Sequence, residues 1–163
     1  MSDPAIILAK PSVHEIFWGM QRYIFDTKCG HLEPYESYVL RLSAGEKFTI
    51  LAYVFIAENT NGGMSQYLSN SSGDYSEDTL EAFEAVGADT ALGALKKIRS
   101  EIFSGQAIPK DRQARCDILF EWEERDEARS AAIYREVNDA LGRCESVELA
   151  MARFMRVNPQ MFT

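Results

Sequence analysis

Few residues of this 163-residue chain could support catalysis or metal binding by their type and spacing. The two histidines are His14 and His31, and Cys29-x-His31 would offer two metal ligands at a loop. No further Cys or His pair is spaced to complete a tetrahedral site, so we predict neither a metal nor a cofactor. His14 falls in the first turn of an expected helix, where an exposed or hydrogen-bonded role is the ordinary one.

Motifs of nucleophilic or phosphate-binding sites are missing from the sequence as well. It contains no nucleophile elbow, phosphate-binding loop, zinc-protease motif or dinucleotide fingerprint. Gly62-Gly63 lacks the preceding strand and the following lysine that a phosphate cradle needs. Carboxylates are numerous, but they fall on expected helix surfaces, where solvation is their usual fate. We therefore expect a protein that binds a partner without catalysing a reaction.

One polar stretch, residues 58–73, separates an apolar run from an acid-rich segment and holds no Cys, His, Lys or Arg. Amides and hydroxyls rarely act as acids, bases or nucleophiles unless an ionisable partner activates them. Our first interpretation is architectural, because a glycine pair permits a sharp corner whose open helix ends nearby polar side chains can satisfy. The alternative is a small-ligand or enzyme site, in which convergent amides line an apolar pocket. The residues of this alternative site are Asn61, Gly62, Gly63, Gln66, Tyr67 and Asn70, and the structural motif adds Glu58 and Gly73.

Carboxylates recur at i, i+4, i+7 in two segments, residues 77–84 and residues 117–124, so each set shares one helix face. Along the helix axis they are roughly 5 Å apart, against about 3.4 Å for the phosphates of one DNA strand. Such a row could engage Lys and Arg groups that normally hold a phosphate backbone, whereas a solvated helix face is the alternative. Arg125 and Arg129 would partly neutralise the second set. The candidate residues for this acidic face are Asp74, Glu77, Asp78, Glu81, Glu84, Asp117, Glu121 and Glu124.

Composition narrows the class of partner. A net charge of -8 and a pI near 4.8 argue against direct binding of nucleic acid or an anionic membrane, because the long-range field repels both. Three widely spaced cysteines form no disulfide framework, and free thiols indicate a reducing cytoplasmic compartment. The apolar run at residues 5–9 is too short for a secretory signal or a membrane span, so we predict a flexible tail over residues 1–11.

Hydrophobic periodicity predicts an all-α fold, a single compact domain of about seven to nine helices over residues 1–163. The most apolar helix, near residues 44–58, follows the capping box Ser43-x-x-Glu46, and we expect it to be central and buried. Ser12 is expected to begin an earlier helix that reaches about Lys28. Ser76 is expected to cap a helix that ends at Gly87.

A later helix carries apolar residues on two sides. Cys116 and Phe120 lie on one side, and Ile118 and Trp122 lie on the other. One side could be core and the other an interface, although core packing alone is the commoner explanation. If an interface exists, a second copy of the chain is its simplest partner.

The double glycine belongs to a wider pattern, Glu58-x-x-Asn61-Gly62-Gly63-x-x-Gln66-Tyr67-x-x-Asn70-x-x-Gly73, followed by Leu80-Glu81-Ala82 and Val86-Gly87-Ala88. This pattern resembles the C-terminal domain of bacterial DNA-mimic proteins, a family long catalogued as a domain of unknown function. The specific match spans Phe48 to Ala94, and a weaker one continues to Asn158-Pro159 and Phe162.

The resemblance implies an all-helical fold and an acidic binding protein. Studied members of that family mimic DNA with surface carboxylates and bind a DNA-binding transcription factor. By resemblance, the expected partner is therefore a basic protein, a DNA-binding regulator for which this chain would compete with DNA. The acidic candidates above come from spacing alone, because acidic positions are not part of the family's shared motif.

Overall fold

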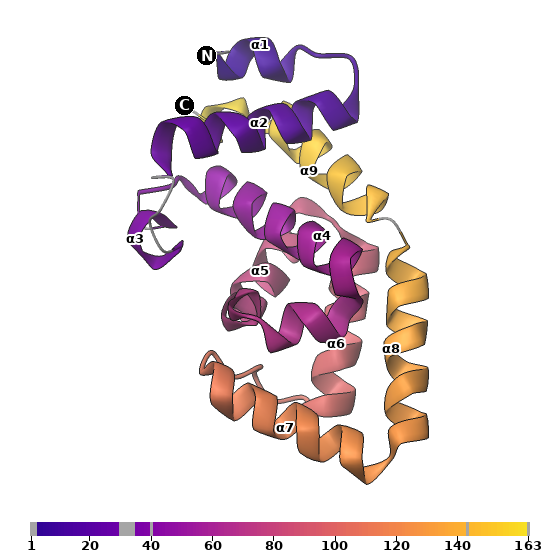
Figure 1. Cartoon of the computed structure of the whole chain (residues 1–163). Helices are drawn as coiled ribbons and strands as arrows, with labels where there is room; N and C mark the ends of the chain where they lie inside the picture. The colour runs from indigo at the N-terminus through magenta and orange to yellow at the C-terminus, as the bar shows by residue number, and fades with distance from the viewer. Residues whose placement is uncertain (1–2, 30–34, 40, 143, 163) are drawn as a thin grey trace.

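The structure, a computed structural model, describes residues 3–29, 35–39, 41–142 and 144–162, so His31 lies outside the described residues. Within these ranges the regular structure is helical and contains no strand, which confirms the all-α prediction (Figure 1). The α-helices are α1 (Pro4–Leu8), α2 (Val13–Lys28), α3 (Tyr35–Val39), α4 (Ala44–Ser69), α5 (Ser76–Val86), α6 (Asp89–Ile102), α7 (Arg112–Arg125), α8 (Glu127–Leu141) and α9 (Glu145–Val157). Two 3-10 helices, η1 (Ser71–Tyr75) and η2 (Pro159–Met161), complete the order.

Helix α4 lies at the centre of the fold and contacts α2, α5, α7, α8 and α9 (Figure 1). The predicted capping box begins it: the Ser43 hydroxyl accepts a hydrogen bond from the Glu46 N–H, and the Glu46 carboxylate accepts one from the Ser43 N–H at 2.8 Å. Its apolar side chains are buried on several sides, and the ring of Phe55 meets those of Tyr67 and Phe83 edge-on. The expectation of a buried central helix is therefore confirmed.

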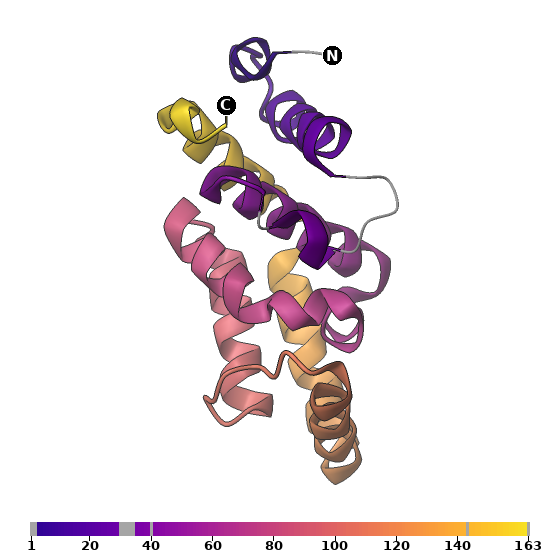
Figure 2. The same ribbon diagram turned by 90° about the vertical axis from the view of Figure 1, so that its left-hand side faces the viewer.

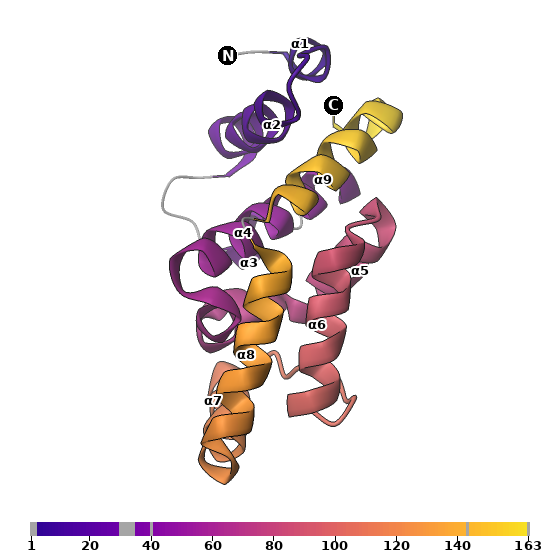
Figure 3. The same ribbon diagram turned by 90° about the vertical axis from the view of Figure 1, so that its right-hand side faces the viewer.

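The two ends of the molecule are built by different helices. Helix α1 lies against α2 at one end, beside the C-terminal part of α9. Helices α7 and α8 meet at Asp126 at the opposite end, as Figure 2 and Figure 3 show. The Asp126 carboxylate caps α8 by accepting a hydrogen bond from the Arg129 N–H at 3.0 Å.

The prediction of a flexible tail over residues 1–11 is wrong for residues 4–8, which form α1. Asp3 caps this helix by accepting from the Ala5 N–H at 2.7 Å, and Pro4 suits a first turn because its missing N–H would be unpaired there. Ile7 is buried, and a methyl group added at Gly19 would lie 3.1 Å from its Cγ2 atom. The glycine therefore lets α1 approach α2 closely.

Ser76 does not cap α5 as predicted. It lies in the first turn of that helix and donates its hydroxyl hydrogen bond to the Gly73 carbonyl at 2.8 Å. The residue at the N-cap position is Tyr75, because η1 runs directly into α5 and leaves no extended residue between them. Gly87 ends α5 as predicted, in a left-handed conformation with φ of 73°.

Among the described residues, no helix combines the length and the apolar character that crossing a membrane requires.

A pair of isoleucine variants tests whether α1 belongs to the core. Ile7 is 5% exposed and Ile6 is 59% exposed, although they are neighbours. Ile7→Ala should lower the free energy of unfolding by about 2–4 kcal/mol, because it leaves a cavity against α2. Ile6→Ala should change it by no more than about 0.5 kcal/mol. Urea denaturation measures both, and equal effects would mean that α1 does not pack as described.

Candidate functional site

Glu58 lies at the centre of a hydrogen-bond network that joins the two sides of the bend in α4. Its Oε2 atom accepts from the amides of Gln66 at 2.6 Å and Asn70 at 2.9 Å, and its Oε1 atom accepts from the Ser72 hydroxyl at 3.1 Å. Glu58 precedes the bend and its three donors follow it, so one carboxylate holds the returning chain. Asn61 is exposed at the corner.

The bend itself depends on the two glycines. Gly62 and Gly63 have non-helical backbone angles inside α4, and Gly63 has φ of 72°, a region that side chains rarely tolerate. A methyl group at Gly63 would also lie 2.6 Å from the Asn138 amide nitrogen of α8. The side-chain Oδ1 atom of Asn138 accepts from the Met64 N–H at 2.9 Å and so caps the helical turn that follows. The predicted architectural role of the glycine pair agrees with this geometry.

Tyr67 fixes the segment after the bend to α5. Its hydroxyl donates to the Thr79 Oγ1 atom at 3.0 Å, and Thr79 donates to the Tyr75 carbonyl at 2.8 Å. Burial raises the pKa of Tyr67 to about 12, against an opposing effect of the hydrogen bond with Thr79. The phenol therefore stays protonated near neutral pH and serves as a structural donor.

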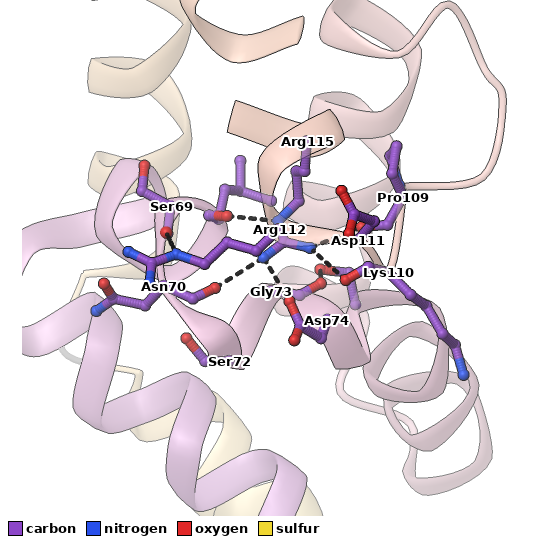
Figure 4. A network of polar contacts seen from close by, with 12 residues as sticks. Ser69, Asn70, Ser72, Gly73, Asp74, Pro109, Lys110, Asp111, Arg112 and Arg115 are labelled. Atoms are coloured by element: carbon purple, nitrogen blue, oxygen red, sulfur yellow. Dashed lines mark hydrogen bonds and ion pairs between the residues drawn. The ribbon is translucent and has the colours of Figure 1, made fainter. Parts of the chain in front are cut away.

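Arg115 is the largest fully buried side chain among the described residues, and it enters the corner from α7 (Figure 4). It makes five hydrogen bonds, which matches the five N–H donors of a guanidinium group. A buried cation is tolerated when its donors are paired in this way. The acceptors are the carbonyl oxygens of Leu68 (2.6 Å), Asn70 (2.8 Å), Pro109 (2.7 Å) and Lys110 (3.1 Å), and the carboxylate of Asp74 (2.7 Å).

Gly73 makes room for this arginine. A methyl group at Gly73 would lie 2.7 Å from the Arg115 Nε atom and 2.8 Å from the Leu68 carbonyl oxygen. Arg112, one turn earlier on α7, is exposed and donates from Nε to the Ser69 carbonyl at 2.8 Å. The two arginines therefore join the start of α7 to the end of α4.

The corner is a closed polar network. The Glu58 carboxylate bonds two amides and a hydroxyl, and the Arg115 guanidinium bonds main-chain carbonyls and Asp74, which favours the architectural interpretation over the small-ligand alternative. Among the described residues, no group of three or more His, Cys, Asp or Glu side chains could hold a metal ion. His14 lies within 3.1 Å of the Glu148 carboxylate, and Cys29 is buried and forms no disulfide with a described residue.

Four of the five acidic candidates between residues 74 and 84 are paired with cations from other segments. The sequence has no base between Phe48 and Leu95, but flanking and distant cations reach into this region. Glu77 also accepts from the Ile108 N–H at 2.9 Å, while Glu81 is exposed and forms no ion pair with a described residue. The pairs are Asp74–Arg115 (2.7 Å), Glu77–Arg99 (3.2 Å), Asp78–Lys47 (2.8 Å), Asp78–Lys110 (3.6 Å) and Glu84–Lys96 (3.2 Å).

The second acidic set remains open. Asp117, Glu121 and Glu124 are exposed along α7, and none forms an ion pair with any residue that the structure describes. Asp117 accepts a hydrogen bond from the Gln113 amide at 2.7 Å. Arg129, which was expected to neutralise this set, instead bonds Glu101 at 2.8 Å.

The structure does not join the two acidic sets into one exposed row, although Asp74 bonds Arg115 of α7 and Glu77 bonds the loop before that helix. Helix α5 lies beside α6, whereas α7 forms the end of the molecule opposite α1 (Figure 2, Figure 3). The acidic residues that we predicted to form one face therefore fall into two groups. Those near α5 are mainly paired with cations, and those on α7 form no ion pair with a described residue.

The two apolar sides of α7 have different surroundings. Trp122 packs edge-on against Tyr134 of α8 with ring centroids 5.7 Å apart, and Leu119 is buried. Phe120 is 61% exposed. The Trp122 side is therefore core. On the other side Phe120 faces solvent, whereas Cys116 is half-buried and its thiol donates to the Ser69 carbonyl at 3.7 Å. The predicted homodimer stays a prediction.

Sequence reasoning missed two residues on which the corner depends. Arg115 was not a candidate because arginine is rarely buried, and its acceptors are mainly main-chain carbonyls that no side-chain pattern reveals. Asn138 was missed because it lies 74 residues from the Met64 N–H that it caps. The one available signal for the arginine was Gly73, since a conformationally costly glycine often marks a close approach.

Replacing Arg115 tests its role in holding the corner. Arg115→Met should lower the free energy of unfolding by about 3–5 kcal/mol, because it leaves Asp74 as a carboxylate without its cation. Arg112→Met is the matched control, and its exposed position should limit the loss to about 1 kcal/mol. Thermal and urea denaturation measure both values, and an equally small loss in both variants would contradict the role assigned to Arg115.

The raised pKa of Tyr67 predicts a loss of stability at high pH. Ordinary tyrosine ionises near 10, so the contribution of buried neutral Tyr67 is complete below pH 10 and is lost as the pH rises through about 12. Between pH 10 and 12, wild type should lose about 2–3 kcal/mol more than Tyr67→Phe. Urea denaturation across this pH range measures the difference; parallel curves would show that Tyr67 ionises normally.

Comparison with known protein families shows the family to which the chain belongs. Residues 40–158, most of the sequence, match the family described as DMP19-like protein. Searches of curated proteins and of solved structures gave no match. The matched range contains the α4 bend, the Arg115 contacts and both acidic sets, and it begins after α3. The chain therefore belongs to the DMP19-like family of DNA-mimic proteins.

Proposed function

We propose that this chain is a non-enzymatic DNA mimic that binds a basic partner protein, a DNA-binding transcription regulator, in competition with DNA. One observation carries the proposal: Asp117, Glu121 and Glu124 lie exposed along one side of α7 without ion pairs to described residues. Membership of the DMP19-like family supports the same function.

The electrostatics of α7 suit a protein that normally holds DNA. A net charge of -8 attracts basic surfaces over a long range, and an unpaired carboxylate keeps its charge available for them. Side chains at i, i+4 and i+7 form a row that a phosphate-binding surface can meet with several Lys or Arg groups at once. Such contacts weaken with salt, as contacts with DNA do.

The carboxylates near α5 that are paired with cations stabilise the fold. Asp74 compensates a buried cation, and Glu77 and Asp78 tie α5 to the loop before α7. They stabilise the fold that presents α7. Glu84 is exposed but paired with Lys96 at 3.2 Å, so Glu81, which is exposed and has no ion pair with a described residue, extends the negative surface at a separate place.

We place the protein in the cytoplasm and assign it no catalytic step. Its three cysteines form no disulfide among the described residues, a state that a reducing compartment preserves. The Glu58 carboxylate and the Arg115 guanidinium are occupied by hydrogen bonds within the protein, so they support the fold rather than a reaction.

The test neutralises the α7 row and compares it with an equal change of charge elsewhere. The test variant combines Asp117→Asn, Glu121→Gln and Glu124→Gln. The control combines Glu15→Gln, Asp26→Asn and Glu145→Gln, which are also exposed. The immobilised proteins are incubated with lysate of the source bacterium, bound proteins are identified by mass spectrometry, and double-stranded DNA is added as competitor.

Wild type and control should retain a DNA-binding protein that DNA displaces. The test variant should bind it roughly 3- to 100-fold more weakly, because three exposed ion pairs are worth about 0.2–1 kcal/mol each. Undiminished binding by the test variant would contradict the proposal and indicate an interaction module that does not depend on charge. Binding that DNA cannot displace would contradict mimicry.

A further inference from the structure

An exposed aromatic ring lies within the acidic row of α7. Three large hydrophobic side chains are exposed among the described residues: Ile6, Phe120 and Val157, with 59%, 61% and 76% exposure. Phe120 alone of these is aromatic. Residues three and four apart are neighbours on a helix surface, so Phe120 lies beside Asp117 and Glu124, and Glu121 follows it in sequence.

Packing within the protein does not account for the position of this ring. The inward side of α7 is already filled by Leu119, by buried Arg115 and by Trp122, whose ring meets Tyr134 of α8. The ring therefore presents an uncovered apolar face among three carboxylates that have no ion pair with a described residue.

An aromatic face flanked by carboxylates suits a guanidinium group in particular. Arginine is planar and weakly hydrated, so it can stack on a ring while its N–H groups bond carboxylates. Lysine can pair with the carboxylates as a point charge, but its strongly hydrated ammonium gains less from the ring. The residues around Phe120 thus distinguish between two cations that a simple row of negative charge would treat alike.

We propose that Asp117, Phe120, Glu121 and Glu124 form a docking surface for an arginine-bearing segment of the partner protein, with a guanidinium stacked on Phe120. This inference rests on the proposed function and names the chemistry of its contact. A phosphate backbone offers no such ring, so Phe120 gives the protein a contact that DNA lacks.

Charge decides between this occupant and a second copy of the chain. Two copies that met symmetrically through this surface would place one acidic row against another, because a two-fold contact joins the same patch on both subunits. Like charges in that position repel, whereas an arginine-bearing segment complements every polar group of the row.

The test uses two synthetic peptides of equal length and charge, one with arginine and one with lysine at every basic position. Their affinities are measured by fluorescence anisotropy at several salt concentrations. The proteins are wild type, Phe120→Ala, Val157→Ala as a control for loss of an exposed apolar side chain, and the α7 variant with Asp117→Asn, Glu121→Gln and Glu124→Gln. Circular dichroism confirms that each is folded.

Wild type and Val157→Ala should bind the arginine peptide about 2- to 5-fold more tightly than the lysine peptide. Phe120→Ala should lose this preference while binding the lysine peptide as wild type does. An equal affinity of wild type for both peptides, or a loss for both with Phe120→Ala, would overturn the role of the ring. Self-association of wild type that Phe120→Ala abolishes would overturn it in favour of a second copy.

The α7 charge variant separates this inference from the proposed function. It should bind both peptides more weakly and with a flatter dependence on salt, because fewer ion pairs form. If it binds both peptides as wild type does, the acidic row is not a binding surface and the proposed function fails. If the α7 charge variant binds the peptides more weakly but Phe120→Ala keeps the preference for arginine, only the stacking inference fails.

Discussion

The buried guanidinium of Arg115 is the constraint on which the presentation of α7 depends. Its five hydrogen bonds reach the end of α4, η1 and the loop that precedes α7, so this one side chain ties the first turn of α7 to the corner. Asp111 caps the start of the helix by accepting a hydrogen bond from the Ala114 N–H at 2.8 Å. At about 100° per residue, an inward Arg115 directs Asp117, Glu121 and Glu124 away from the core. The network of the α4 corner and the acidic row are thus parts of one arrangement.

The charges of the protein consequently serve two purposes. Some carboxylates compensate cations that hold the fold: Asp74 does so for Arg115 at the corner, and buried Glu46 does so for Lys28 at the start of α4, at 2.8 Å. Carboxylates on α7 contribute no ion pair to the described structure and remain available to a partner. A net charge of -8 alone could not reveal this division, because it weights a buried and an exposed carboxylate equally.

The sequence predicted those parts of the fold that local chemistry decides. The capping box at Ser43, the central apolar helix, the bend at Gly62-Gly63 and the end of α5 at Gly87 were all predicted from neighbouring residues. The features that the sequence did not predict depend on contacts between residues far apart in the chain. Helix α1 is short and packs against Gly19, the Arg115 acceptors are mainly main-chain carbonyls, and the cations beside Glu77 and Asp78 come from other segments. Because the sequence around α5 contains no base, it indicated an exposed and unpaired acidic surface. In the folded protein, cations from other segments pair with most of these carboxylates.

The most direct measurement is carbodiimide labelling of carboxylates, read by mass spectrometry, in the free protein and in its complex with the basic partner. In the free protein, Asp117, Glu121 and Glu124 should label quickly, whereas Asp74 beside Arg115 should label slowly. The partner should protect the three α7 carboxylates and leave exposed Glu145 on α9 unchanged. Unprotected α7 carboxylates in the complex, or Asp74 labelling as fast as Glu121 in the free protein, would contradict the account.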